Sequence, residues 1–480
     1  MPLVSSGRLS DSERRSHYSD RSNCLEALRG KTMVFVSPGY PGKRFIFDKA
    51  LELGVNSVVI DSPGSWTLEL QKAGIVKKVI ELDMTRDEDD IFTQAVDAIK
   101  ALALTVDGIC TFVELSAPLT ARLCEQFQVS GHSPQSVEMA RDKYLTRKAV
   151  ANTDSTAKYA VRNYLVKDGS TAELQRAAAS VGFPAVLKPV SGAASLGVQK
   201  VTNMDELVET YHKTCVLVSE LIVSSGALER KVTMESTDSN EDLKTNVSSL
   251  NNTAIVLEEY IAGQEVDIDI VLCDGEMTYC EISDNGPTVE PYFGETWNCC
   301  PTLLSEEAQA EMREMALSIT VDALGFESGV FHVEGKYSPN GPRLIEVNCR
   351  MGGGPVRGVQ ILRSNVDLVV EQILLSVGLP SVPPAIPVNE RKAIGFVDVN
   401  ARKSGSIGNL DFVAECFANR PGMVYVKPFI TPGEHIVGPE EGQPTWLAEA
   451  VFIRDTPAEA QRDAIELNEE MQGVFESHYL

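Results

Sequence analysis

Two glutamates and an asparagine in the segment 329–349 have the spacing of a metal site on a β-hairpin. Glu334 lies before the turn-forming sequence Asn340-Gly341-Pro342, and Glu346 and Asn348 lie after it. We expect a three-residue loop, because Pro342 has no N–H to donate to the ladder. Residue 334 would then face residue 348. Since side chains alternate along a strand, Glu334, Glu346 and Asn348 would share one face.

The chemistry of these side chains suits Mg²⁺, which binds one or two carboxylates together with substrate phosphates. A solvated sheet face is the alternative, because it would show the same pattern. The residues after Asn348 help to distinguish the two interpretations. Arg350 has the same strand parity as Asn348, and a guanidinium there could hold a phosphoryl group or a carboxylate. The glycines at 352–354 would let a ligand approach the backbone closely, although a flexible turn is the alternative.

A second candidate site follows the apolar segment 183–187, which we expect to be a strand. Lys188 ends this strand, and a loop of small residues that includes Ser191 and Ser195 comes next. The N–H groups of such a loop can fold over phosphates, and Lys188 would add a point charge. A solvated lysine at a strand end is the alternative. The segment 39–44 is predicted to be a plain turn, because a P-loop needs Ser or Thr where Arg44 stands.

A third segment could bind a nucleoside. The sequence Glu258-Glu259-Tyr260-Ile261 ends a predicted strand before a short turn. Backbone groups there could face an adenine, and Glu265 could reach ribose hydroxyls. Taken alone, this pattern is weak.

The elements that would position these residues fall into several regions. Residues 31–130 alternate short apolar runs with helical patterns, which predicts a parallel sheet with helical crossovers. Residues 224–253 are polar and turn-rich, and 380–387 are rich in proline. We predict a disordered polar tail (1–30), an N-terminal α/β domain (31–140), a central domain (141–378) with a lid at about 150–262 that carries a disordered insertion (224–253), and a C-terminal α/β subdomain (379–480) after the Pro-rich linker.

In sequence order, these pieces resemble the signature of the ATP-grasp superfamily. Lys143 begins the series, and it continues through Lys188, Glu258, Glu334 and the segment 346–350. The resemblance covers roughly residues 30–480. Segments 331–334 and 343–353 are similar to the ligase region of carnosine synthases and to bacterial L-amino-acid ligases. The fold implied is α/β with an α+β lid, preceded by a doubly wound N-terminal domain.

The resemblance implies a role for each candidate residue. Arg350 and Lys188 would be catalytic, and the segment 293–296 resembles a loop that contacts a substrate amino group through Glu295. The full set is Lys143, Lys188, Ser191, Ser195, Glu258, Glu259, Tyr260, Ile261 and Glu265 for ATP, Glu334, Glu346 and Asn348 for Mg²⁺ or Mn²⁺, and Glu295, Asn298, Arg350 and Gly353 for substrates.

The function implied is an ATP-dependent ligase that joins an amino-acid carboxylate to an amine through an acyl phosphate and forms a carnosine-like dipeptide. Two alternatives stay open. One is another ATP-grasp enzyme, such as a carboxylase or a purine-pathway ligase. The other is a non-catalytic ATP-binding regulatory protein.

Composition limits the partners. The net charge of −25 disfavours nucleic acid, whose phosphates attract basic surfaces. No apolar run approaches the length of a membrane span. The ten cysteines are scattered and suggest reduced thiols. We therefore expect a cytoplasmic protein that acts on small molecules without a membrane, and the resemblance allows a homodimer.

Overall fold

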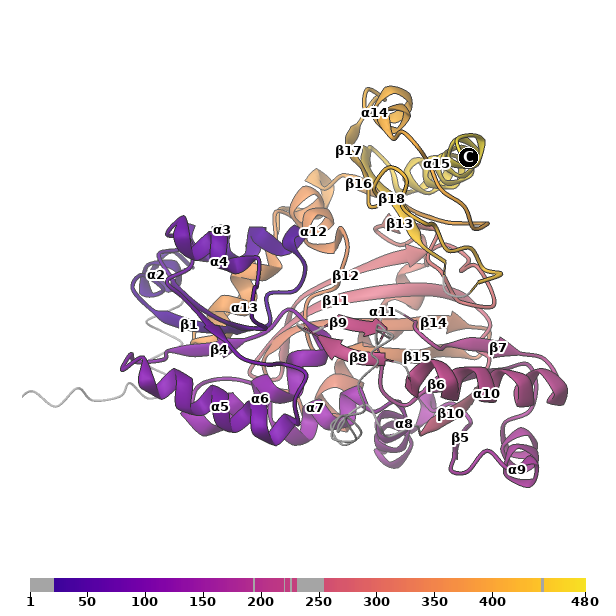
Figure 1. The fold of residues 1–480 in the computed structure, drawn as a ribbon, viewed down its shortest axis with the longest axis horizontal. Helices are drawn as coiled ribbons and strands as arrows, with labels where there is room; N and C mark the ends of the chain where they lie inside the picture. The colour runs from indigo at the N-terminus through magenta and orange to yellow at the C-terminus, as the bar shows by residue number, and fades with distance from the viewer. Residues whose placement is uncertain (1–20, 193–194, 220, 225–226, 231–253, 442–443) are drawn as a thin grey trace, which may run out of the picture.

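The computed structural model describes residues 21–192, 195–219, 221–224, 227–230, 254–441 and 444–480. Its N-terminal part contains a parallel sheet in the order β3-β2-β1-β4. Val34 and Val36 of β1 pack with α5 (Glu88–Ala101) and α6 (Ala117–Phe127). Met33 and Phe35 pack on the opposite face with α2 (Arg21–Ala27) and α3 (Phe45–Glu52). Helices therefore cover both faces, as predicted for a doubly wound domain (Figure 1). The strands are β1 (Thr32–Val36), β2 (Asn56–Asp61), β3 (Lys78–Glu81) and β4 (Gly108–Cys110).

The predicted disordered tail is wrong for its last residues. Helix α2 (Arg21–Ala27) precedes the sheet, because Cys24 and Leu28 are buried in the N-terminal core. Arg21 also donates a 3.0 Å hydrogen bond to Glu371. Residues 1–20 of the predicted tail lie outside the described residues.

A four-stranded sheet in the order β5-β10-β6-β7 lies in the region predicted to be a lid, and we refer to it by that name. Helices α9 and α10 bury Leu174 and Leu207 against it. The predicted disordered insertion is wrong at its start, where β8 and β9 form a small hairpin. Most of the remainder, residues 231–253, lies outside the described part of the chain. The strands are β5 (Asn163–Val166), β6 (Ala185–Pro189), β7 (Gln199–Val201), β8 (Leu221–Ser224), β9 (Ala227–Arg230) and β10 (Ile255–Glu259).

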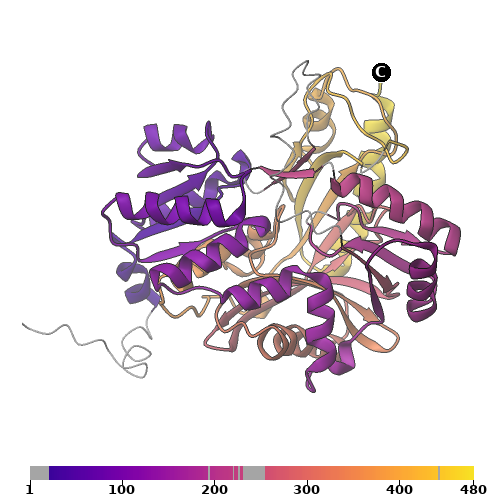
Figure 2. The same ribbon diagram turned by 60° about the horizontal axis from the view of Figure 1, so that its bottom comes forward.

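The largest sheet has eight strands in the order β15-β14-β11-β12-β13-β16-β18-β17. The strands that follow the Pro-rich segment extend this sheet, because β16 pairs with β13. Figures 1 and 2 show the lid and the N-terminal sheet beside it. The strands are β11 (Gln264–Cys273), β12 (Glu276–Asn285), β13 (Trp297–Cys300), β14 (Gly329–Ser338), β15 (Gly341–Asn348), β16 (Ala393–Asn400), β17 (Met423–Pro428) and β18 (Trp446–Arg454).

The β14–β15 hairpin differs from its prediction in register. Ser338 pairs with Gly341 across a two-residue turn, so Pro342 lies in the ladder and not in the loop. A bulge shifts the register between Glu334 and Gly335 and gives β15 one extra residue. Glu334 consequently faces Glu346 rather than Asn348. The expected sharing of one face survives because the bulge offsets the shorter turn.

The helices pack mainly as crossovers and sheet covers. Among the described residues, none is both long and apolar enough to cross a bilayer. Their bounds, besides α2, are α3 (Phe45–Glu52), α4 (Thr67–Lys72), α5 (Glu88–Ala101), α6 (Ala117–Phe127), α7 (Pro134–Arg141), α8 (Lys143–Asn152), α9 (Thr171–Val181), α10 (Met204–Ser219), α11 (Glu306–Ser318), α12 (Val356–Ser364), α13 (Leu368–Ser376), α14 (Asp411–Phe417) and α15 (Pro457–Ser477).

Candidate active site

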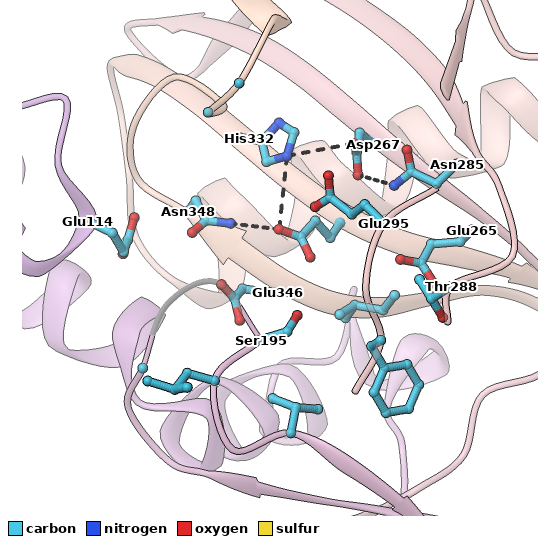
Figure 3. Close-up of a pocket in the computed structure, with 18 of the residues that line it drawn as sticks. Glu114, Ser195, Glu265, Asp267, Asn285, Thr288, Glu295, His332, Glu346 and Asn348 are labelled. Atoms are coloured by element: carbon cyan, nitrogen blue, oxygen red, sulfur yellow. Dashed lines mark hydrogen bonds and ion pairs between the residues drawn. The ribbon is translucent and has the colours of Figure 1, made fainter. Parts of the chain in front are cut away.

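A cavity of about 640 Å³ is lined by the lid sheet, the central sheet and loops of the N-terminal domain. Most of the residues predicted from the sequence line it, although they come from distant segments (Figure 3). The predicted residues on its wall are Lys143, Lys188, Ser195, Glu258, Glu259, Tyr260, Ile261, Glu265, Glu295, Glu334, Glu346, Asn348, Arg350 and Gly353.

Two predicted residues do not lie on this wall. Ser191 is absent from the lining, whereas Gly192 and Ser195 of the same loop belong to it. Asn298 is buried behind the wall, where its amide donates to the side chain of Asn285, a lining residue. Asn298 pairs with Asn285 across β12 and β13, so it supports a lining residue, and its substrate contact stays a prediction.

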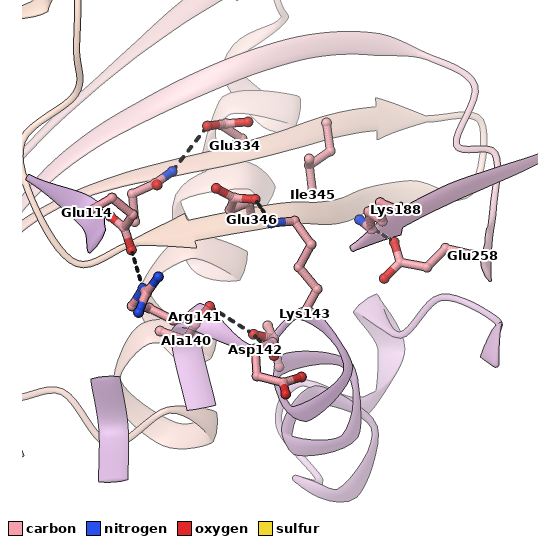
Figure 4. A network of polar contacts seen from close by, with 12 residues as sticks. Glu114, Ala140, Arg141, Asp142, Lys143, Lys188, Glu258, Glu334, Ile345 and Glu346 are labelled. Atoms are coloured by element: carbon pink, nitrogen blue, oxygen red, sulfur yellow. Dashed lines mark hydrogen bonds and ion pairs between the residues drawn. The ribbon is translucent and has the colours of Figure 1, made fainter. Parts of the chain in front are cut away.

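The paired carboxylates of the hairpin have unequal surroundings (Figure 4). Lys143 forms a 2.7 Å ion pair with Glu346, which outweighs burial and lowers the pKa of Glu346 to about 2. Burial and the charge of Glu346 raise the pKa of Glu334 to about 8. The amide of Asn348 donates a 3.1 Å hydrogen bond to Glu334. Neighbouring carboxylates whose pKa values shift in opposite directions are typical of functional sites.

The oxygens of Glu334, Glu346 and Asn348 form a donor set of the kind that Mg²⁺ or Mn²⁺ accepts. Within the described ranges, no group of three or more His, Cys, Asp or Glu side chains could hold a metal ion. Two carboxylates and an amide oxygen fit a divalent cation that takes its other ligands from phosphate and water.

His332 and Asp267 extend the polar wall and were missed by the sequence analysis. His332 Nδ1 lies 2.8 Å from Asp269 Oδ1, and its Nε2 lies 3.9 Å from Asp267. Burial lowers the pKa of His332, but Asp267 and Asp269 outweigh it and raise the pKa to about 10. Burial and Glu295 raise the pKa of Asp267 to about 7. The sequence could have predicted His332, because residues 332 and 334 are two positions apart on one strand and their side chains therefore share a face.

A cluster of cations surrounds one buried carboxylate beneath the lid. Lys188 Nζ lies 2.6 Å from Glu258, and Arg147 donates to both oxygens of the same carboxylate at 3.0 Å. Burial, Arg147 and Lys143 together lower the pKa of Lys188 to about 8 despite Glu258. The positive charge exceeds what Glu258 neutralises, so this end of the cavity is suited to an anion. Arg147 was missed, although it follows Lys143 by one helical turn.

The N-terminal domain fixes the guanidinium of Arg350. Arg350 Nε lies 3.1 Å from Glu114, which belongs to a short 3₁₀ turn after β4. Arg350 also donates a 3.1 Å hydrogen bond to Asn348. The predicted turn after β1 is a 3₁₀ helix, Pro41–Arg44, whose Lys43 lines the cavity and donates to the carbonyl of Phe112.

Where the lid meets β11, the predicted nucleoside-binding residues form polar contacts with neighbouring side chains. Glu265 forms a 3.1 Å ion pair with Lys336, and Glu259 forms a 2.8 Å ion pair with Arg162. The hydroxyl of Tyr260 donates a 3.1 Å hydrogen bond to Glu290. Tyr260 and Ile261 both line the cavity.

Glu295 projects into the cavity beside Asp267 and His332 (Figure 3). Its loop is anchored from the C-terminal part of the chain. Asn400 of β16 donates a 2.6 Å hydrogen bond to the carbonyl of Glu295, and Asn468 of α15 donates a 2.7 Å hydrogen bond to the carbonyl of Thr296. Burial raises the pKa of Glu295, which leaves an acidic group able to receive a cation.

Comparisons with known proteins identify the family of the chain. Residues 47–129 match the ATP-grasp N-terminal domain, and residues 181–357 match the ATP-grasp domain. Carnosine synthase 1 of Homo sapiens is 30% identical over 377 residues, which are 77% of this chain and 42% of that protein. Alanine–anticapsin ligase of Bacillus subtilis is 26% identical over 309 residues, or 62% of this chain and 58% of that protein. The chain thus spans less than half the length of the carnosine synthases that it matches.

A solved structure has the same fold. The L-amino acid ligase from Bacillus licheniformis superposes with a TM-score of 0.68 at 20% identity, covering 92% of this chain and 98% of that one. Together with the two domain matches, this likeness confirms the predicted architecture. The chain belongs to the ATP-grasp superfamily and is a relative of its amino-acid ligases.

Proposed function

We propose that the protein is an ATP-dependent carboxylate–amine ligase that joins an amino acid to an amine, and that a dipeptide is its product. One observation carries the proposal: a single cavity combines a cationic end, a pair of carboxylates and an acidic loop at Glu295. Relatives named as ligases support the reaction class.

The residues divide the work along the cavity. Lys188 and Lys143 would bind the phosphates, while Arg147 and Glu258 hold Lys188 in place. The lid at about 150–262 would close over the nucleotide, with adenine against Tyr260 and Ile261 and ribose against Glu265. Mg²⁺ or Mn²⁺, held by Glu334, Glu346 and Asn348, would neutralise phosphate charge.

Two displacements then form the amide. A carboxylate oxygen of the first substrate attacks the γ-phosphorus, the bond to the bridging oxygen breaks, and ADP leaves. The nitrogen of the second substrate attacks the acyl carbon, phosphate leaves, and the nitrogen gives up one proton. Arg350, fixed by Glu114, would neutralise charge on the acyl phosphate, and closure of the lid would exclude water.

Glu346→Gln tests this assignment most directly. Loss of one carboxylate charge from the metal site should lower amino-acid-dependent phosphate release by at least roughly 100-fold. Phosphate release should be measured with Mg²⁺ and ATP across pairs of amino acids, including β-alanine with histidine. Glu276→Gln, an exposed position on β12, is the matched control.

The outcomes separate the candidate functions. Unchanged phosphate release by Glu346→Gln would overturn the metal assignment. Release that needs bicarbonate rather than an amine would identify a carboxylase. ATP binding without release under any pair would favour a regulatory ATP-binding protein.

A further inference from the structure

Two buried carboxylates from the C-terminal strands lie outside the nucleotide site. Asp398 of β16 and Glu449 of β18 are 3% and 5% exposed and face each other across the ladder. Asp398 Oδ1 and Glu449 Oε2 accept no hydrogen bond within the described part of the chain. The other oxygen of Glu449 accepts a hydrogen bond from the hydroxyl of Tyr425. A buried carboxylate oxygen without a partner is costly, so it requires an explanation.

One of the two carboxylates, that of Asp398, belongs to the cavity wall, and that of Glu449 lies beside it. Phe396 and Asp398 line the cavity, as their alternation along β16 requires. Glu449 shares their face because it pairs with Asp398. A Cβ placed on Gly354, another lining residue, would lie 3.5 Å from Glu449 Oε2.

The surroundings of the pair favour a positively charged ligand. Burial, Glu295 and Glu449 raise the pKa of Asp398, with a smaller contribution from Asp267 and an opposing one from Trp446. Burial also raises the pKa of Glu449, although Tyr425 and Lys427 oppose the shift. No ion pair to either carboxylate occurs among the described residues.

The same wall also offers aromatic surface. Tyr40, Phe396 and Trp446 line the cavity, and the charge of Glu449 contributes to the raised pKa of Tyr40, which places the two groups near each other. Aromatic faces attract organic cations and cover aliphatic chains. Carboxylates beside aromatic rings therefore suit an alkyl ammonium or guanidinium better than a small metal ion.

We propose that Asp398 and Glu449 form a subsite for a second cationic group of the substrates, an ammonium or guanidinium at the end of an aliphatic chain. This inference rests on the proposed ligase function and narrows it to substrates such as basic amino acids. The cation can belong to the acid that is activated or to the amine that attacks.

The test compares substrates that differ only in this charge. Lysine and norleucine should be supplied separately, each with the same panel of partner amino acids, and kcat/KM measured from dipeptide formation. We expect the wild-type protein to prefer lysine by at least roughly tenfold. Asp398→Asn and Glu449→Gln should each reduce this preference severalfold, whereas Glu415→Gln, at an exposed position of α14, should keep it.

Each outcome decides a separate point. A wild-type protein without preference for lysine, or variants that slow lysine and norleucine equally, would overturn the subsite, while dipeptide formation from neutral amino acids would leave the ligase function standing. If Asp398→Asn unfolds, Glu449→Gln decides alone. Mass spectrometry of the product distinguishes the two sources, because lysine at the N-terminal position marks the activated acid and lysine at the C-terminal position marks the amine.

Discussion

At the residue scale, the lowered pKa of Lys188 should make ATP affinity depend on pH. Its pKa of about 8 reflects burial and the nearby charges of Arg147 and Lys143, only partly offset by Glu258. A bound triphosphate stabilises the charged lysine, so it raises this pKa. ATP affinity should therefore be constant well below pH 8 and fall as pH rises above it, by up to roughly tenfold per pH unit.

Calorimetric titration with ATP between pH 6.5 and 9.5 measures this profile. Lys188→Met should weaken binding at pH 7 and flatten the profile. Lys43 also has a pKa near 8 and lines the same cavity, so Lys43→Met is the control that should leave the slope in place. A Lys188→Met protein with the wild-type slope would show that another group titrates.

The limits of sequence reasoning are clearest for individual residues. Lys188, Glu334 and Arg350 were found because each stands inside a local pattern of charge beside glycines or a turn. Glu114, Asp398 and Glu449 have no such neighbours. Glu114 and Asp398 reach the cavity, and Glu449 lies beside Asp398, only because their strands and turns pack there. That packing depends on long-range contacts that local spacing does not encode.

At the element scale, the β14–β15 hairpin illustrates a partial success. Parity correctly placed Glu334 and Glu346 on one face, but the loop length and register were wrong. Two errors offset each other, since the turn is shorter than expected and a bulge adds one residue. A bulge has no dependable sequence signature here, because Ile345 resembles any other strand residue. The four N-terminal strands were easier to predict because apolar runs and helices alternate regularly.

Helix α15 gives a prediction at this scale. Asn468 donates to the carbonyls of Thr296 and Asp398, which links the Glu295 loop to the sheet. Asn468→Ala removes both hydrogen bonds, although the N–H of Asp398 still donates to the carbonyl of Thr296, so the loop should lose part of its fixed position. We expect KM for the amino-acid substrates to rise by roughly tenfold while the Kd for ATP stays unchanged.

Steady-state kinetics and nucleotide titration on the same preparation check this expectation. Glu469→Ala, at the adjacent exposed position, controls for changes to the helix itself. An equal loss of ATP affinity would indicate general destabilisation rather than loss of the loop anchor.

At the scale of the whole molecule, nucleotide binding should increase the free energy of unfolding. The cavity draws walls from the lid, the central sheet and the N-terminal domain, so a nucleotide bound there joins all three. A non-hydrolysable ATP analogue with Mg²⁺, at 100 times its Kd, should stabilise the folded protein by about 2.7 kcal/mol. Thermal unfolding with and without Mg²⁺ measures the effect.

The Glu346→Gln variant supplies the comparison for this measurement. It should retain the stabilisation produced by the analogue alone and lose the increment that Mg²⁺ adds. A full Mg²⁺ increment in the variant would place the cation elsewhere. The net charge of the protein is −25. It does not oppose nucleotide binding, because the positive side chains of Lys143, Arg147 and Lys188 are concentrated beneath the lid.

The eight-stranded sheet has a consequence for how such proteins diversify. The match to the ATP-grasp domain ends at residue 357, whereas β16 begins at Ala393. The strands that carry Asp398 and Glu449 thus lie beyond the segment that matches the ATP-grasp domain, although they continue the same sheet. Substitutions in these strands could change the substrate while the ATP-binding region stays the same. Related proteins could therefore acquire new products through mutations at one edge of the sheet.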